Sequence, residues 1–290
     1  MAVSRYIAFA ALLALPSAAQ AQALSGKGEA QTGTPPATIA ISGSTALVSD
    51  YRFRGVSQSD RDMAVQGGIT ASHASGAYAG VWASNLAGWG TFGGANMELD
   101  LIAGYKAALA ANAALDVGLT WYMYPGGAAK TDFAEPYAKL TGTAGPATLT
   151  AGVAYAPKQQ ALGRWYRTGA DAAAGVYTDK GAKDDNLYLW GDAAVAVGQT
   201  AFMAKAHIGH SSGQNGLAPN ATALSPTGSY WDWSLGVDAR WRSVTLGLSY
   251  VDTDIGKREA AYLQPSFSKG QDGRGSIAGG TLVVALTAAF

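Results

Sequence analysis

The sequence lacks cysteine, has few charged residues, and contains no apolar run long enough for a transmembrane helix. Without cysteine the chain can form no disulfides, so its stability must come from other sources. Twenty basic and twenty acidic residues give a formal net charge of zero, which argues against bulk attraction to nucleic acid or anionic lipid. The first apolar run, residues 6–16, is too short to span a bilayer, so a membrane role would have to be performed by strands.

Glycine and aromatic residues, by contrast, are plentiful. The chain has 38 Gly, 8 Trp, 14 Tyr and 7 Phe, while charged residues make up 14%. This composition is typical of all-β proteins with many short strands and turns.

The N-terminus has the three parts of a secretory signal. Arg5 supplies the positive charge, residues 6–16 the apolar core, and "AQAQA" the small residues at a cleavage site after Ala21 or Ala23. We therefore expect a signal peptide over residues 1–23. Residues 24–36, rich in Gly, Thr and Pro, are expected to be a flexible periplasmic lead-in, and residues 37–290 the folded domain.

After Pro36, stretches of about ten alternating residues recur, which is the length that a tilted strand needs to cross a bilayer. Twelve strands are predicted: residues 38–54, 63–74, 77–87, 96–109, 113–124, 131–142, 146–156, 185–197, 200–210, 230–241, 244–253 and 277–290. Successive connectors alternate in length: every second one is short, and most of the others are longer. Outer-membrane barrels have this asymmetry, with tight periplasmic turns and long extracellular loops.

Alternation within the strands provides a second criterion. In "DWSLGVDARW", residues 232–241, one row is Trp, Leu, Val, Ala and Trp, and the other is Asp, Ser, Gly, Asp and Arg. A soluble sandwich or a lipocalin-like barrel would also alternate. Aromatic residues near strand ends, however, suit the two girdles at membrane interfaces. These are Tyr51, Phe53, Trp82, Trp121, Tyr124, Tyr155, Trp231, Trp233, Trp241 and Tyr250.

The last strand alternates as well and ends the chain in Phe290. A terminal aromatic residue of this kind resembles the signal by which outer-membrane proteins are presented to the barrel assembly machinery. The alternative is an ordinary edge strand that ends in Phe by chance. Together these features predict a closed antiparallel transmembrane β-barrel of about twelve strands in the bacterial outer membrane of a Gram-negative cell.

Residues 47–86 carry a resemblance to a known family. The strand ending in "SDYRFRG", the "SQSD" loop, the "QGG" strand and the "YAGVWASN" strand resemble the N-terminal signature of the TorF-like family of proteobacterial porins. Further similarities are "ELDLIAGY", "DVGLTWYMYP", "EPYAKL", "WDWSLGVD" and "LGLSYVDTD". The loop from Pro157 to Asp184 and the "SFSKGQDGRGS" segment depart from the pattern. The resemblance implies an outer-membrane pore and brings no catalytic residue or substrate.

Charged residues fall on the row opposite the apolar one, and a closed barrel would direct them into its lumen. Around residues 45–54 this predicts that Arg52 and Arg54 point inward while Tyr51 and Phe53 meet lipid headgroups. Residues 57–62 would then form the first external loop. The lumen-lining candidates are Asp50, Arg52, Arg54, Glu98, Asp100, Asp116, Glu135, Lys139, Asp192, Lys205, Asp232, Asp238, Arg240 and Arg242, with Lys106 and His207 on the same row.

Two roles are open for these charges. They could line a selective pore, or they could pair across strands and stiffen the wall. The long fourth loop, from Pro157 to Asp184, could plug the lumen with Arg164, Trp165, Tyr166 and Arg167, or could be a solvated surface loop.

Catalytic and metal sites find little support in the sequence. His210 with Ser211 and Ser212 could imitate a Ser–His pair, but adjacent residues on a strand point apart. No spacing matches a calcium loop, a phosphate loop or a dinucleotide fold. The sequence therefore predicts a non-enzymatic channel for passive diffusion of small hydrophilic solutes, without cofactor or metal. Outer-membrane lipid and lipopolysaccharide are the other expected partners. The alternatives are a structural or adhesive barrel with an occluded lumen, and a barrel enzyme of the lipase type.

Overall fold

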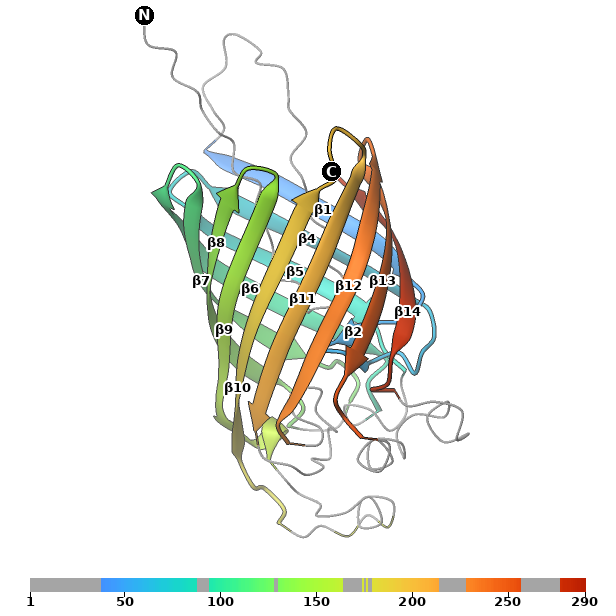
Figure 1. Ribbon diagram of the computed structural model, residues 1–290. Helices are drawn as coiled ribbons and strands as arrows, with labels where there is room; N and C mark the ends of the chain where they lie inside the picture. Colours follow the sequence, from blue (N-terminus) through green and yellow to red (C-terminus); the bar gives the residue numbers. More distant parts are fainter. Residues whose placement is uncertain are drawn as a thin grey trace, which may run out of the picture.

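Twelve strands form a closed antiparallel barrel, in which each strand is hydrogen-bonded to its neighbours in the sequence and the last closes on the first (Figure 1). The computed structural model describes residues 38–87, 94–127, 130–163, 174, 176, 179–213, 228–256 and 277–290. The wall strands are β1 (Ile39–Val48), β4 (Ala64–His73), β5 (Ala77–Asn85), β6 (Met97–Ala110), β7 (Ala113–Met123), β8 (Phe133–Ala144), β9 (Ala147–Gln159), β10 (Asp184–Ala196), β11 (Phe202–Gly213), β12 (Tyr230–Trp241), β13 (Val244–Thr253) and β14 (Thr281–Ala289). The predicted fold class and strand number are confirmed.

The barrel closes between β1 and β14. Leu47 pairs with Leu286 in an antiparallel register, and Gly43 and Phe290 exchange two backbone hydrogen bonds of 3.0 Å. On its other side β1 pairs with β4, and Val48 lies directly opposite Ala64. No strand of the barrel therefore has an unpaired edge that could join another sheet.

The connectors differ between the two ends of the barrel, as the sequence predicted. Residues 74–76, 111–112, 145–146, 197–201 and 242–243 join strands at the end where the C-terminus lies, called here the turn end (Figure 1). The strand ends that are followed by longer stretches of sequence lie at the opposite end, called here the loop end. Glycines with positive φ, such as Gly76 (103°) and Gly145 (59°), allow the tight turns.

The two faces of each strand also differ. In β7, Val117, Leu119 and Trp121 are exposed, whereas Asp116 and Tyr122 are buried. In a closed barrel the exposed row is the outer face and the buried row the inner face. The predicted alternation is thus confirmed, with an apolar exterior and a polar interior.

The sequence prediction was wrong at the loop end of the first strand. The strand predicted over residues 38–54 ends at Val48, and β2 (Arg52–Phe53) and β3 (Val56–Ser57) form a separate two-stranded sheet. Every residue from Asp50 to Asp60 is buried. Residues 49–63 are called here the inner hairpin. Its residues 50–60 therefore fold into the barrel and do not form an external loop, as the position of β2 in Figure 1 shows, while Ser49 and residues 61–63 at its two ends are exposed.

The apolar core lies inside the barrel, because apolar side chains of the inner hairpin pack against those of the inner wall. Tyr51 and Phe53 join buried side chains of the wall from β4 to β9, among them Trp82, Tyr122 and Phe133. Tyr51 and Phe53 consequently do not meet lipid headgroups. Helical structure is sparse among the described residues, where β9 is followed by a short 3-10 turn, Gln160–Leu162. No helix within the described ranges is long and apolar enough to cross a membrane.

Candidate functional site

The inner hairpin turns back on itself at Arg54 and Gly55. Phe53 pairs with Val56, and the two residues between them have positive φ, 47° and 80°, as in the two-residue turn that matches the twist of paired strands. A side chain at position 55 would collide with the side chain of Thr253 and come within 2.9 Å of the Asp232 Cβ. Glycine is therefore required here both for its backbone conformation and for the close approach to the wall.

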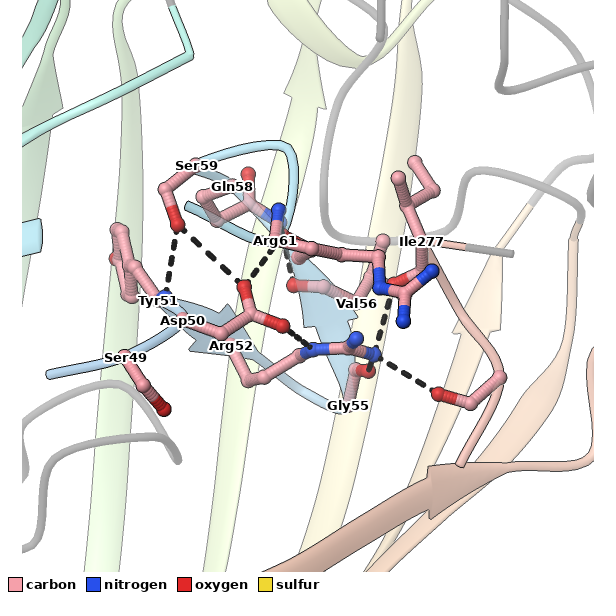
Figure 2. Close-up of polar contacts among 12 residues, drawn as sticks. Ser49, Asp50, Tyr51, Arg52, Gly55, Val56, Gln58, Ser59, Arg61 and Ile277 are labelled. Carbon is pink, nitrogen blue, oxygen red and sulfur yellow. Dashed lines mark hydrogen bonds and ion pairs between the residues drawn. The ribbon is translucent and has the colours of Figure 1, made fainter. Parts of the chain in front are cut away.

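Asp50 fixes the base of the hairpin. One carboxylate oxygen accepts a hydrogen bond from the Ser57 hydroxyl at 2.6 Å. The other accepts one from Arg52 Nε at 2.6 Å, which Figure 2 shows. The Tyr51 backbone N–H donates to the Ser59 hydroxyl at 2.9 Å. Hydrogen bonds that involve a charged partner are stronger than neutral ones, so Asp50 holds both arms of the hairpin together.

Arg52 connects the hairpin to the segment that precedes β14. Its Nη1 donates to the carbonyl oxygens of Gly55 at 2.9 Å, Ile277 at 2.8 Å and Gly279 at 3.1 Å, and the bond to Ile277 is drawn in Figure 2. The Ser57 N–H donates to the same Ile277 carbonyl at 2.8 Å. Arg52 is fully buried and acts here as a structural cross-link.

Arg54 connects the hairpin to the opposite part of the wall. Its Nη2 donates to both carboxylate oxygens of Glu135 on β8, at 2.7 and 2.8 Å, and its Nη1 donates to Asn186 on β10 at 3.1 Å. The guanidinium lies 3.9 Å from the ring centroid of Tyr188, which adds a cation–π contact. The Arg54 carbonyl accepts a hydrogen bond from the Tyr230 hydroxyl at 3.1 Å.

Aromatic rings fix the remaining side of the hairpin. Tyr51 packs edge-on against Trp82 of β5, with centroids 5.5 Å apart, and Phe53 packs against Tyr122 of β7 at 6.0 Å. The Tyr51 hydroxyl also donates to Glu98 on β6 at 2.9 Å. The hairpin is thus attached to β5, β6, β7, β8, β10, β12 and the segment before β14, which together make up most of the circumference.

Other predicted charges on the inner wall form pairs between neighbouring strands. Lys139 lies 3.3 Å from Asp116, and Lys205 lies 2.7 Å from Asp238. His207 has Asp192 at 2.7 Å on one ring nitrogen and Asp232 at 3.0 Å on the other. These contacts match the wall-stiffening hypothesis.

Three predicted residues have a different environment. Asp100 is buried on β6, and neither of its carboxylate oxygens has a hydrogen-bond partner within the described part of the chain. Arg240 is half-buried, and its Nε donates to the Arg242 carbonyl at 3.1 Å. Arg242 lies in the turn between β12 and β13, where its side chain is exposed over the ring of Trp241. The expectation that Arg242 faces the lumen is therefore corrected.

The geometry around His210 does not form a Ser–His pair. Its ring packs on Trp231, an exposed outer-face residue, with centroids 4.6 Å apart. The Ser211 hydroxyl is buried and accepts a hydrogen bond from Asn186 at 3.0 Å. Over the described ranges, no group of three His, Cys, Asp or Glu side chains is arranged to hold a metal ion.

Several residues that hold the hairpin were not predicted from the sequence. Asn186, Tyr188 and Tyr230 carry no charge and were not singled out, although their row is the inner one. Ser57 was assigned to an external loop. The residues predicted to form a plug from the fourth loop, Arg164, Trp165, Tyr166 and Arg167, lie outside the described residues.

The outer face carries exposed aromatic side chains near both ends. Trp121, Tyr155, Trp231 and Tyr250 lie toward the loop end, and Tyr105, Phe202, Trp241 and Phe290 toward the turn end. Trp231 and Trp241 are ten positions apart on β12. At about 3.3 Å per residue and a tilt of about 40°, this separates them by about 25 Å along the barrel axis. Some of the aromatic residues predicted at the interfaces are therefore exposed on the outer face, whereas Tyr51, Phe53, Trp82 and Tyr124 are buried inside the barrel.

The protein therefore belongs to the class of closed twelve-stranded antiparallel barrels, with a polar interior and an apolar exterior. Residues 30–290 match the family model described as a bacterial protein of unknown function, Gcw_chp, and the chain belongs to that family. The matching model does not carry the TorF-like name, so that resemblance stays a prediction. No curated protein matches the chain.

Solved structures of similar fold include outer-membrane channels. The KdgM porin in complex with disordered oligogalacturonate is 8% identical, with 86% of this chain and 98% of that chain covered and a TM-score of 0.46. The outer membrane channel DcaP of Acinetobacter baumannii is 9% identical, with 87% and 97% covered and a TM-score of 0.38. The translocator domain of the autotransporter NalP from Neisseria meningitidis is 12% identical, with 89% and 88% covered and a TM-score of 0.42.

Proposed function

We propose that the protein is an outer-membrane channel for passive diffusion of small hydrophilic solutes, and that the inner hairpin forms its constriction. The observation that carries the proposal is a closed barrel whose inner wall bears charged side chains of both signs while its outer wall is apolar. A polar interior in a membrane barrel is typical of channels. The hairpin narrows the interior near the loop end, so we expect only small solutes to pass.

The outer surface supports a location in the bacterial outer membrane. Exposed aliphatic side chains such as Leu119, Leu235 and Leu248 lie between the two sets of exposed aromatic residues. The separation of about 25 Å between those sets equals the height of the apolar band of outer-membrane barrels. A soluble barrel would gain nothing from this arrangement, because the same side chains would face water.

A second function is favoured by the number of bonds that the hairpin makes. Arg52 and Arg54 are both buried and tie the hairpin to opposite parts of the wall. If this attachment is permanent and leaves no path for solutes, the protein is a structural or adhesive barrel with an occluded lumen. The lipase-type alternative is not favoured by the position of the His210 ring on Trp231.

The exterior also supports the expected macromolecular and lipid partners. Outer-membrane lipid and lipopolysaccharide would contact the apolar band and the loop end. Phe290 is exposed at the end of the closing strand, where we expect the barrel assembly machinery to recognise it.

The experiment is single-channel conductance of the refolded mature protein in a planar bilayer, with the reversal potential measured under a salt gradient. Discrete ohmic steps would support the channel. A folded barrel that never conducts would support the occluded barrel and overturn the channel proposal. Arg52→Ala and Arg54→Ala variants should shift the reversal potential toward cation selectivity if these side chains contribute to the field along the path.

A further inference from the structure

Glu98 and Asp100 are two buried carboxyl groups at alternate positions of β6, and their exposed fractions are 2% and 0%. Residues i and i+2 of a strand lie on one face about 7 Å apart. Glu98 accepts a hydrogen bond from the Tyr51 hydroxyl, and no cation is paired with either carboxyl group within the described ranges. The other ion pairs of the inner wall leave these two acids uncompensated.

The inner hairpin covers Asp100. Its cross-strand partners are Trp82 on β5 and Tyr122 on β7, and the hairpin rings of Tyr51 and Phe53 pack on those two side chains. The Asp100 carboxylate oxygens are fully buried and have no hydrogen-bond partner in the described part of the chain. Seating the hairpin therefore removes a carboxyl group from water without offering it a donor.

The neighbouring groups do not relieve this situation. The titratable neighbours of Asp100 are Glu98 on the same strand, Tyr122 on β7, Tyr124 beyond β7, Glu135 on β8 and Tyr51 of the hairpin. Trp82, on β5, carries no charge. Arg54 belongs to the same cluster, but both oxygens of Glu135 hold its guanidinium. Arg54 therefore offers Asp100 no hydrogen bond, and negative charge on Asp100 is opposed by the neighbouring Glu98 carboxyl group.

We propose that Glu98 and Asp100 form a pH-responsive latch under the inner hairpin. With both carboxyl groups protonated the hairpin is seated, because a neutral acid is far less costly to bury than an isolated anion. When the groups ionise, water reaches them as the Tyr51 and Phe53 side of the hairpin leaves the wall. The latch regulates the constriction of the proposed channel and in that sense rests on the proposed function. Acidic medium would keep the path through the channel narrow, and neutral medium would widen it.

Thiol labelling measures the movement of the hairpin without relying on conductance. Gln58 is 2% exposed, and its side chain donates to the Val56 carbonyl of the hairpin itself. Because the chain has no cysteine, Gln58→Cys introduces a single thiol that a membrane-impermeant maleimide reaches when the hairpin is displaced. The labelling rate of the Gln58→Cys variant is measured in liposomes between pH 5.5 and 8.5. At each pH it is divided by the labelling rate of the double variant Gln58→Cys with Asp100→Asn. The ratio cancels the intrinsic pH dependence of the thiol.

The latch predicts a ratio that rises with pH by about tenfold or more, since each pH unit over which one further proton is released changes the opening equilibrium about tenfold. Asp116→Asn in place of Asp100→Asn is the matched control. Asp116 is also buried on the inner wall but is paired with Lys139. The labelling rate of the Asp116→Asn variant should therefore still depend on pH, unlike that of the Asp100→Asn variant. If Asp100→Asn does not fold, Glu98→Gln replaces it in the same comparison.

A ratio that stays constant over the pH range, at one or at any other value, would overturn the latch. These results are separable from the channel proposal. A barrel that conducts while its ratio is constant would refute the latch alone. A barrel that never conducts while its ratio rises with pH would refute the channel and leave the movement of the hairpin established.

Discussion

The guanidinium of Arg54 and the carboxylate of Glu135 form a buried pair with two hydrogen bonds, 2.7 and 2.8 Å long, between residues 81 positions apart in the chain. Arg54 lies at the tip of the inner hairpin and Glu135 on β8. The inner hairpin links the adjacent strands β1 and β4, and this pair holds the hairpin against a distant part of the wall. Residues near the N-terminus thus help to shape the barrel interior.

The first prediction concerns this pair. Arg54→Ala should lower the free energy of unfolding by about 3 to 5 kcal/mol, because it leaves the buried Glu135 carboxylate without its cation. Urea unfolding of the refolded protein in detergent micelles measures the change. Arg61→Ala is the control, since Arg61 is exposed and such substitutions usually change stability by less than about 0.5 kcal/mol.

The double variant Arg54→Ala with Glu135→Gln tests whether the cost belongs to the pair. Because the second change removes the uncompensated charge, part of the stability should return. Strictly additive losses would contradict a direct interaction between the two residues.

The second prediction concerns the turn of the hairpin. Gly55 and Gly126 have nearly equal φ, 80° and 78°, but a Cβ at position 126 meets no atom within 4 Å. Alanine at either position costs about 1 to 2 kcal/mol of backbone strain. Gly55→Ala should destabilise the protein more than Gly126→Ala, because its methyl group also collides with Thr253 and Asp232. Equal shifts in the urea midpoint would show that the hairpin tip is not seated against the wall.

The third prediction concerns the apolar outer face. Leu235 is 64% exposed near the middle of β12, and Trp241 is 69% exposed at its end. In a bilayer, Leu235→Arg should cost about 2 to 4 kcal/mol, whereas Trp241→Arg exchanges an interfacial residue for a charge that costs about 0 to 1 kcal/mol at that depth. Unfolding measured in phospholipid vesicles provides the comparison. Equal tolerance of both substitutions would contradict a membrane-spanning wall.

The fourth prediction concerns the C-terminal residue. Phe290→Ala should slow insertion into vesicles that contain the barrel assembly machinery, and Phe290→Tyr should not, because it keeps an aromatic ring. The measurement is the rate of appearance of the folded band on unheated gels. Insertion of Phe290→Ala at the original rate would refute recognition through this residue.

Most of the barrel was predictable because its strands alternate and its connectors alternate in length. Residues 230–241 show this well: the predicted strand and β12 coincide, with Asp232 inside and Trp241 outside. The period of two reports which residues share a face, and an apolar outer face in a membrane barrel makes the assignment of sides unambiguous.

The inner hairpin was not predictable from the same signal. Tyr51 and Phe53 continue the apolar row of β1, and alternation cannot distinguish a row that meets lipid from one that meets an aromatic interior. The partners that decide the matter, Trp82 and Tyr122, lie on strands brought close only by the closure of the barrel. The glycine at position 55, between two short strand-like pairs, was the local signal of a tight turn.

Conductance of a barrel without the hairpin tests the central claim most directly. Val48 and Ala64 lie opposite each other in register, so a short turn such as Asn-Gly can replace residues 49–63 without stretching the wall. If the inner hairpin is the constriction of a channel, the original protein should conduct in small steps and the shortened variant in clearly larger ones. Equal conductance in two well-folded barrels would contradict the account, because the hairpin would then not limit the path.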